Sequence, residues 1–369
     1  MPTNTPCKNR AGKTAFIMSS KAVRNMKLRL PDDFFGPLLE FIRNPDITDI
    51  TWNGSCLWLD DLSRGRYSSE VKLSDEFINL FTIRLANLVN RNFNSSEPIL
   101  EAETDDLRIS VIDSSLTNGG KSIAIRKTPA VRRLNERRMI DEGYASLQVL
   151  ALLKAFVLGH CSIIVTGDVG SGKTELIKYL THFIPCHERT ISIEDNYELR
   201  LGAINPKLDC VEIKVHEGFD YSMAIKAALR QLCKWLLMSE ARSREVTQLL
   251  EAASTGCSVM TTIHSGDVRK IPDRVINMMG SEGDERKSDV YNFFDVAILV
   301  KIEKTESGIH RHLSQIGILD RNLKGDNSMT VIYDEGFTGE RLPWNLWCKI
   351  KESGVPVKYF SNIRPEDDI

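Results

Sequence analysis

The strongest chemical signal in this sequence lies at 167–174, which reads GDVGSGKT. Its glycines, lysine and threonine match the phosphate-binding template G-x-x-x-x-G-K-[ST] at every fixed position. In such a loop, backbone N–H groups and the start of the following helix bind phosphate oxygens. We therefore predict an ATP site whose phosphates are held by Gly167, Asp168, Val169, Gly170, Ser171, Gly172, Lys173, Thr174 and Glu175.

Two of these side chains have specific expected roles. Lys173 should reach the β- and γ-phosphates, and the hydroxyl of Thr174 should bind Mg²⁺. The apolar run at 162–166 predicts a short buried strand before the loop, and 175–180 predicts the first turns of a helix after it. This setting favours a working phosphate loop over an ordinary glycine-rich turn.

Phosphate transfer also needs an acid near the metal, a base for the attacking water, and positive charge. Three later segments each read as an apolar strand that ends in polar residues: 191–199, 235–242 and 255–265. Ligands of open α/β sheets bind at the carboxyl ends of the strands. All three polar clusters are therefore expected beside the phosphate loop.

Four residues in these segments are candidate catalytic groups. Glu194 is expected to support the metal or its water, and Glu240 to polarise the attacking water. Arg242 could hold a phosphate or fix Glu240, and His264 could contact the γ-phosphate. Each has a plainer reading, as a charged loop, a surface ion pair or a structural histidine, so their common position carries the argument.

The elements that position these groups differ between the two halves of the chain. From residue 146 onward the pattern alternates between helix and strand, with strands expected at 161–166, 189–194, 210–215, 234–238, 258–263, 294–303 and 313–334. This alternation predicts an α/β fold with a largely parallel sheet, of the RecA-like P-loop NTPase type, over 146–369.

The region 30–128 reads as a smaller α+β N-terminal domain. Expected elements are a short helix at 34–42, a hairpin at 46–59, a long amphipathic helix at 74–90, and strands at 107–112 and 122–126. The buried stripe expected on the long helix consists of Phe77, Leu80, Phe81, Leu85 and Leu88. Residues 1–29 are expected to form a flexible basic leader. Residues 129–145 are expected to be the linker, with a short helix.

Composition limits the classes of function. The chain has 369 residues and a formal net charge of −2, so it lacks the global positive field of a dedicated nucleic-acid binder. We expect no direct nucleic-acid binding. No apolar run is long enough to cross a bilayer, and the eight cysteines form no C-x-x-C pair. These features favour a cytoplasmic protein with reduced thiols.

Taken in order, the motifs resemble those of the secretion-type traffic ATPases, which serve type II and type IV secretion, conjugation and pili. The phosphate loop matches theirs, and Glu194 with its neighbours is similar to their Asp box. Segment 229–242 resembles their Walker B region, 255–264 their His box, and 46–54 their N-terminal opening. The chain looks closest to the conjugation and tight-adherence branch.

The resemblance implies a homo-oligomeric, hexameric ring that hydrolyses ATP with Mg²⁺. It implies that Arg108 and Arg126 of the N-terminal domain clamp the nucleotide. It further implies a motor at the inner face of a bacterial membrane, working on integral membrane proteins of a secretion, conjugation or pilus-assembly machine. A P-loop kinase or a DNA translocase is a third, weaker reading.

Several positions depart from the family pattern. Glu175 replaces a second threonine, Ser239 a glycine, and Cys257 a histidine, while Cys233 and Lys234 stand where a Pro-Asp pair is common. The candidate catalytic residues are retained, so we expect activity. The altered Walker B neighbourhood leaves open an alternative, a nucleotide-binding assembly platform with little intrinsic hydrolysis.

Overall fold

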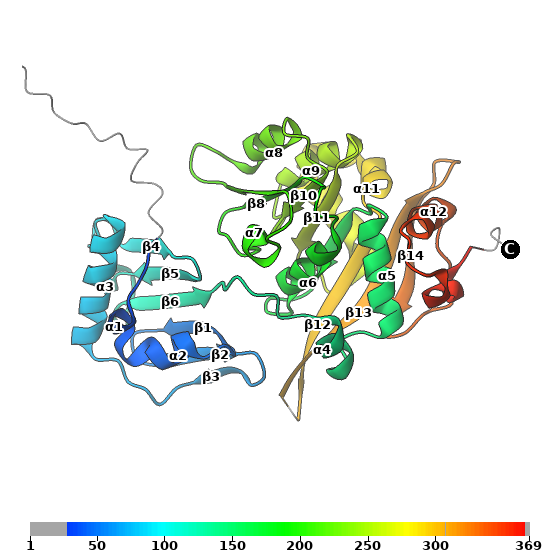
Figure 1. Ribbon diagram of the computed structural model, residues 1–369. Helices are drawn as coiled ribbons and strands as arrows, with labels where there is room; N and C mark the ends of the chain where they lie inside the picture. The colour runs from blue at the N-terminus through cyan, green and yellow to red at the C-terminus, as the bar shows by residue number, and fades with distance from the viewer. Residues whose placement is uncertain (1–27, 307, 366–369) are drawn as a thin grey trace, which may run out of the picture.

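The computed structural model describes residues 28–306 and 308–365. Two lobes are visible, joined by the segment that leads into helix α4 (Glu136–Asp141) (Figure 1). The basic leader expected over 1–29 falls almost entirely outside the described residues. The end of the chain beyond residue 365 lies outside them too.

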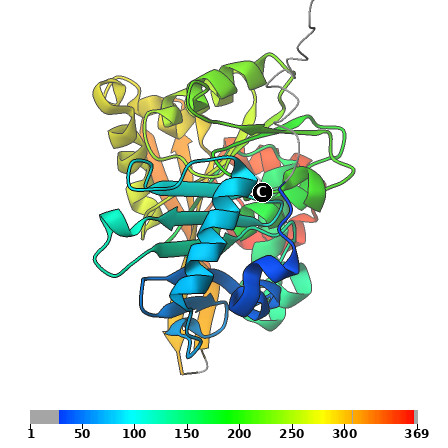
Figure 2. The ribbon, with the colours of Figure 1, turned by 90° about the vertical axis from the view of Figure 1, so that its left-hand side faces the viewer.

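The N-terminal lobe is built on one antiparallel sheet in the order β3-β2-β1-β6-β5-β4. Its strands are β1 (Ile47–Trp52), β2 (Leu57–Asp61), β3 (Gly65–Ser68), β4 (Ile99–Glu103), β5 (Leu107–Ile112) and β6 (Ser122–Lys127). Its helices are α1 (Asp32–Phe35), α2 (Leu39–Arg43) and α3 (Asp75–Val89). Figure 2 shows α3, in cyan, running across this sheet with the larger lobe behind it.

Alternation along the strands gives this sheet one apolar face. In β5, for example, Leu107, Ile109 and Val111 are buried in the core under α3, and the residues between them point to the other face. That other face carries Arg108 and Arg126 and is turned toward the larger lobe. The sheet therefore packs on its helices and presents polar side chains to the second lobe.

Helix α3 confirms the expected start and part of the expected buried stripe, and corrects two of its positions. Ser74 caps the helix, because its side chain accepts a hydrogen bond from the N–H of Phe77. The prediction that Leu80 and Leu88 are buried is wrong, since their side chains are 55% and 47% exposed. Phe81 and Leu85 of the expected stripe are buried as predicted and Phe77 is partly buried, and the buried face is completed by Ile78, Thr82 and Ala86.

The other N-terminal predictions are confirmed with two differences. The helix expected at 34–42 is split into α1 and α2 at Gly36, which has a φ of 45° and is followed by Pro37. Strands β3 and β4 were not expected, because both are short edge strands with alternating exposed residues. The hairpin turn follows β1, where the side chain of Asn53 accepts hydrogen bonds from the next backbone N–H groups.

The C-terminal lobe holds an eight-stranded sheet in the order β14-β13-β12-β7-β11-β10-β8-β9. Its strands are β7 (Ile163–Thr166), β8 (Thr190–Glu194), β9 (Cys210–Lys214), β10 (Trp235–Met238), β11 (Ser258–Ile263), β12 (Val296–Thr305), β13 (Gly308–Arg321) and β14 (Asn327–Asp334). The six strands from β12 to β9 are parallel, and β13 and β14 are antiparallel. The region expected as strand at 313–334 is thus two strands joined by a turn.

Helices cover both faces of this sheet, as expected for an α/β fold (Figure 1). They are α5 (Leu147–Leu158), α6 (Lys173–Leu180), α7 (Leu201–Ile204), α8 (Tyr221–Leu229), α9 (Glu245–Ser254), α10 (Ile271–Met279), α11 (Lys287–Phe293) and α12 (Trp344–Glu352). In β7, Ile163 and Val165 join the core on one face, and Ile164 joins the core on the other. Burial on both faces explains why these strands read as continuous apolar runs.

Candidate functional site

The phosphate loop lies between β7 and α6, at the carboxyl edge of the parallel strands. Gly167 has a φ of 146°, and a Cβ there would lie 2.2 Å from the carbonyl oxygen of Val300. Gly172 has a φ of 96° and forms the N-cap of α6. Only glycine fits both positions, so the loop conformation follows directly from its sequence.

Lys173 is bonded to the loop itself. Its Nζ donates to the carbonyl oxygens of Gly167 at 2.9 Å and Asp168 at 3.0 Å, and lies 3.4 Å from Nδ1 of His264. Burial lowers the pKa of Lys173, while the nearby charge of Glu240 acts in the opposite direction. A phosphate oxygen that binds in the loop can therefore accept hydrogen bonds from Nζ of Lys173, which now donates to these two carbonyl oxygens.

Glu240, Arg242 and His264 form one connected cluster beside the loop. The Glu240 carboxylate accepts a hydrogen bond from Nη2 of Arg242 at 2.8 Å and lies 3.1 Å from Nε2 of His264. Since His264 also touches Lys173, the cluster is continuous with the phosphate loop. Strands β10 and β11 are direct neighbours, which explains why residues 24 positions apart meet here.

The charges around Glu240 keep it ionised. Burial acts to raise the pKa of Glu240, but the hydrogen bond and charge of Arg242, with His264 and Lys173, lower it below the ordinary value. An ionised carboxylate can accept a proton from water. While it is paired with Arg242, however, Glu240 is a weaker base than a free carboxylate.

Glu194 makes no hydrogen bond or ion pair with this cluster in the described part of the chain. It is fully buried, and its Oε2 accepts hydrogen bonds from the backbone N–H groups of Glu198 and Leu199 at 2.9 and 3.0 Å. Its Oε1 has no partner among the described residues. Burial raises the pKa of Glu194 to about 7, although the two N–H groups act to lower it. Glu194 therefore organises the loop at 195–199.

This pKa gives a pH prediction for stability. Because the pKa of Glu194 is raised in the folded state, its contribution to stability is complete below about pH 4.5 and is lost as the pH rises through about 7. We expect Glu194→Gln to remove about 2–3 kcal/mol of that loss between about pH 5 and 8. Urea unfolding of the wild type and of Glu194→Gln at these two pH values measures the change in the free energy of unfolding. The exposed substitution Glu251→Gln is the control and should keep the pH dependence of the wild type. Equal pH slopes in all three proteins would contradict the prediction.

The two N-terminal arginines lie side by side. Arg108 and Arg126 are direct partners across β5 and β6. Nε of Arg126 donates to Asp49 at 2.8 Å, and its Nη1 lies 3.9 Å from the carboxylate of Glu198 in the larger lobe. This face of the small sheet therefore brings positive charge to the acidic loop at 195–199 that follows β8. Glu198 of that loop also acts electrostatically on Lys173 of the phosphate loop.

Asp195 and Glu198 belong to the site but were not among the predicted site residues. Asp195 lies 3.7 Å from Nη1 of Arg242, and Glu198 acts electrostatically on Lys173. Their signal was present in the sequence, as further acids of the cluster that follows β8. What the sequence did not show is that Glu194 turns inward and leaves these neighbours to face the site.

Glu175, predicted to bind nucleotide, faces the linker. Its Oε1 accepts from Nζ of buried Lys178 at 3.0 Å, and its Oε2 accepts from the backbone N–H of Arg133 at 3.3 Å. A carboxylate in the first turn of α6 is favoured by the helix dipole. The replacement of threonine by glutamate at this position is thus matched by a buried lysine one turn later.

Arg311 is the clearest residue that sequence reasoning missed. It extends from β13, and its Nε donates to the carbonyl oxygen of Gly170 in the phosphate loop at 2.9 Å. Its Nη1 donates to the carbonyl oxygen of Leu62, in the turn between β2 and β3, at 2.6 Å. It forms no ion pair with any described carboxylate. Arg311 therefore links the phosphate loop to the N-terminal lobe by one side chain.

Two departures from the expected motifs meet in space. Sγ of Cys233, before β10, lies 3.4 Å from Sγ of Cys257, before β11. Both thiols lie at the amino ends of strands whose carboxyl ends carry Glu240 and His264. These substitutions therefore change the edge of the sheet opposite the site and leave the site itself intact.

Residues 97–308, more than half of the chain, match the family described as "Type II/IV secretion system protein". The chain belongs to this family. An uncharacterised protein of Bacillus anthracis is 29% identical over 263 residues, which are 70% of this chain and 59% of that protein. The type IV pilus assembly ATPase PilB of Pseudomonas aeruginosa is 33% identical over 138 residues, 37% of this chain and 24% of PilB.

Two solved structures share the fold of this chain. The ATPase DotB of Yersinia pseudotuberculosis has a TM-score of 0.60 and 17% identity, covering 81% of this chain and 83% of DotB. The pilus retraction motor PilT with bound ADP has a TM-score of 0.56 and 17% identity, covering 91% and 90%. The predicted fold class, a RecA-like C-terminal domain with a smaller α+β N-terminal domain, is confirmed.

The chain spans little more than half the length of the first curated relatives it matches, 59% and 53%. Within residues 28–306 and 308–365, helices are too short or too polar to cross a lipid bilayer.

Proposed function

We propose that this protein hydrolyses ATP and uses the energy to drive a secretion, conjugation or pilus-assembly machine. The observation that carries the proposal is the continuous line from Lys173 through His264 to Glu240 and Arg242, beside a phosphate loop. In this proposal one cluster contains a lysine that binds phosphate, Lys173, a carboxylate that acts as the base, Glu240, and a second cation, Arg242. Membership of a family that includes ATPases supports the same activity.

In the proposed reaction, the loop N–H groups and Lys173 hold the phosphates and neutralise their charge. Glu240 accepts a hydrogen bond from the attacking water and orients it toward the γ-phosphate. His264, between Glu240 and Lys173, couples the base to the phosphate position. Arg242 fixes the carboxylate of Glu240, with which it is paired.

The residues present fit a magnesium ion. Thr174 is half-buried in the first turn of α6, directly after the lysine, and Glu194 has a free Oε1 that can hold a water molecule. A bound Mg²⁺ would neutralise charge on the β- and γ-phosphates. Thr174 and Glu194 remain the candidates for holding it, Glu194 through water.

We propose a homo-hexameric ring, in which Arg108 and Arg126 present positive charge to the nucleotide. Arg126 already contacts Glu198 across the gap between the lobes. A nucleotide that changes this contact would move the small lobe, and that motion is the proposed output. The partners would be integral membrane proteins of the machine, reached from the cytoplasmic face of the membrane.

A second candidate function is an assembly platform that binds nucleotide without useful hydrolysis. It is favoured by one feature, the direct pairing of Glu240 with both Arg242 and His264. This pairing weakens the proposed base. On this reading the protein binds ATP tightly and releases no phosphate.

The deciding experiment measures phosphate release by purified protein with ATP, with and without Mg²⁺, while the particle mass is recorded in the same sample. Mg²⁺-dependent turnover from a particle of six copies supports the motor. Tight ATP binding without turnover supports the platform. Absence of both would contradict the nucleotide site itself.

Arg311 provides a separate prediction about the link between nucleotide and N-terminal lobe. In Arg311→Met, the hydrogen bonds to Gly170 and Leu62 are lost, and a charge beside the phosphates disappears. We expect the Kd for ATP to rise about tenfold, as loss of a charged hydrogen bond implies. Hydrogen exchange at 62–65 should become faster. Fluorescent-nucleotide titration and mass-resolved exchange measure both effects.

The control is Arg64→Met in the same turn, because Arg64 lies over the ring of Tyr67 and does not touch the phosphate loop. The prediction for Arg311→Met would be contradicted if the Kd and the exchange at 62–65 matched those of the Arg64 variant.

A further inference from the structure

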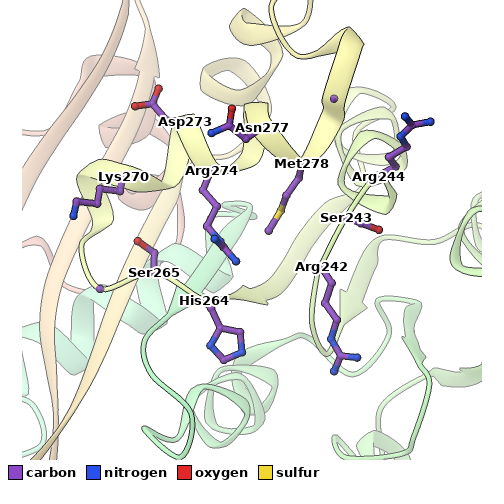
Figure 3. Close-up of a pocket in the computed structure, with 12 residues that line it drawn as sticks. Arg242, Ser243, Arg244, His264, Ser265, Lys270, Asp273, Arg274, Asn277 and Met278 are labelled. Carbon is purple, nitrogen blue, oxygen red and sulfur yellow. The ribbon is translucent and has the colours of Figure 1, made fainter.

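A large, open pocket lies next to the catalytic cluster, on its side away from the phosphate loop. It has a volume of about 900 Å³ and is bordered by the loop after β10, the loop after β11 and helix α10. Figure 3 shows Arg274 extending from α10 toward His264, with Met278 beside it. We call this the basic pocket.

Its lining carries an excess of positive charge. Arg242, Arg244, Lys270 and Arg274 line it, against one acid, Asp273. Arg244, Lys270 and Arg274 form no ion pair with any residue in the described part of the chain. Three unpaired cations around one hollow favour a ligand with several negative charges.

The chemistry of the walls narrows the class of ligand. Among the lining residues the one ring is the imidazole of His264, which is engaged with Glu240 and Lys173, so a nucleic-acid base finds little surface on which to stack. Met278 is the one large apolar side chain in the lining, so the pocket does not suit an apolar helix. Exposed cations spread around a wide hollow match carboxylates spaced along an extended peptide.

Arg242 belongs both to this pocket and to the catalytic cluster. Its side chain is 64% exposed, and it pairs with Glu240 at 2.8 Å and with Asp195 at 3.7 Å. A carboxylate entering the pocket would compete with Glu240 for this guanidinium. Loss of that pairing frees one oxygen of Glu240 and makes it a stronger base.

We propose that the basic pocket docks an acidic segment of a protein partner, and that docking speeds hydrolysis by drawing Arg242 away from Glu240. The inference rests on the proposed function, because Glu240 is the base in that reaction. It assigns the machine partner a chemistry, a run of Asp or Glu side chains. It also gives a reason for the paired state of Glu240 in the protein alone.

The test uses a fluorescent hexaglutamate peptide and the full chain. We expect saturable binding by anisotropy that weakens with salt. We expect the peptide to raise ATP turnover about twofold to fivefold, the range that a half-exposed ion pair is worth. The double variant Lys270→Gln/Arg274→Gln should lose most of the binding and all of the stimulation, with basal turnover unchanged.

The matched control removes two exposed lysines that do not line the pocket, as Lys226→Gln/Lys324→Gln. It should bind the peptide and respond to it like the wild type. Equal binding by both double variants would overturn the proposal, as would binding that leaves turnover unchanged. A wild type that shows no turnover with or without the peptide refutes the motor and, with it, the stimulation, whereas an active wild type that binds the peptide and is not stimulated overturns this proposal alone.

The same variant, together with lipid vesicles, distinguishes an acidic protein segment from two other possible occupants of the pocket. If the Lys270/Arg274 variant changes the particle mass, a second copy of this chain occupies the pocket. If phosphatidylserine vesicles bind through Lys270 and Arg274 and the peptide does not, the pocket contacts a membrane. Either result overturns the assignment to an acidic protein segment.

Discussion

Lys173→Ala should weaken ATP binding by about a hundredfold or more and reduce turnover to background. Nζ of Lys173 now satisfies the carbonyl oxygens of Gly167 and Asp168 and touches His264. In the bound state it would pair with phosphate oxygens instead, and removal of one partner of a close charge pair costs about 2–5 kcal/mol. Titration with a fluorescent ATP analogue and phosphate release measure the two effects.

A charge-matched control is Lys226→Ala, which removes an exposed lysine from α8. Both variants should melt within about 2 °C of the wild type, because each truncates a side chain outside the apolar core. If Lys173→Ala binds ATP like the wild type, the loop at 167–174 is not the nucleotide site. A fall in binding with a matching fall in melting temperature would instead indicate a folding defect.

The phosphate loop and the positions of Glu240 and His264 could be predicted because their signals are local. Each follows a short apolar strand, and parallel strands bring their carboxyl ends to one edge. The strands β7, β10 and β11 are buried on both faces, so their sequence runs are unmistakable. Adjacent positions at that edge, β7 beside β11 beside β10, then bring the groups into contact.

Arg311 could not be predicted for the opposite reason. It lies 141 positions after Gly170 and reaches the phosphate loop only because β13 runs antiparallel beside β12, next to β7. Nothing in its neighbourhood in the sequence marks it. Its partners are carbonyl oxygens, which every residue has, so no complementary residue type signals the contact.

Glu194 and helix α3 show a second limit, the direction of a side chain. The sequence places a carboxylate at the end of β8 but does not show that backbone N–H groups in the following loop draw it inward. In α3 the apolar residues extend around more than one face, so pattern alone does not separate the buried Leu85 from the exposed Leu88. Packing of α3 against β4 and the hydrophobic core of this sheet makes that choice.

Glu240→Gln should reduce ATP turnover by about 10²–10⁴-fold while ATP binding stays close to the wild type, because glutamine removes the general base and keeps the shape. The amide oxygen can still accept from Arg242, while the amide N–H₂ would face the Nε2–H of His264, so the contact with His264 weakens although the side chain keeps its shape. Lys173 and the loop N–H groups are untouched. Phosphate release and fluorescent-nucleotide titration on the same samples separate the two effects.

The matched control is Glu251→Gln on α9, whose carboxylate pairs with Arg286 outside the cluster. It should leave turnover unchanged. Normal turnover in Glu240→Gln would remove Glu240 from the role of base and turn attention to Asp195 and Glu198, the other acids at this edge. A wild type that binds ATP but hydrolyses it as slowly as Glu240→Gln would favour the platform. In that case Glu240 stays paired with Arg242 after ATP binds and does not act as a base.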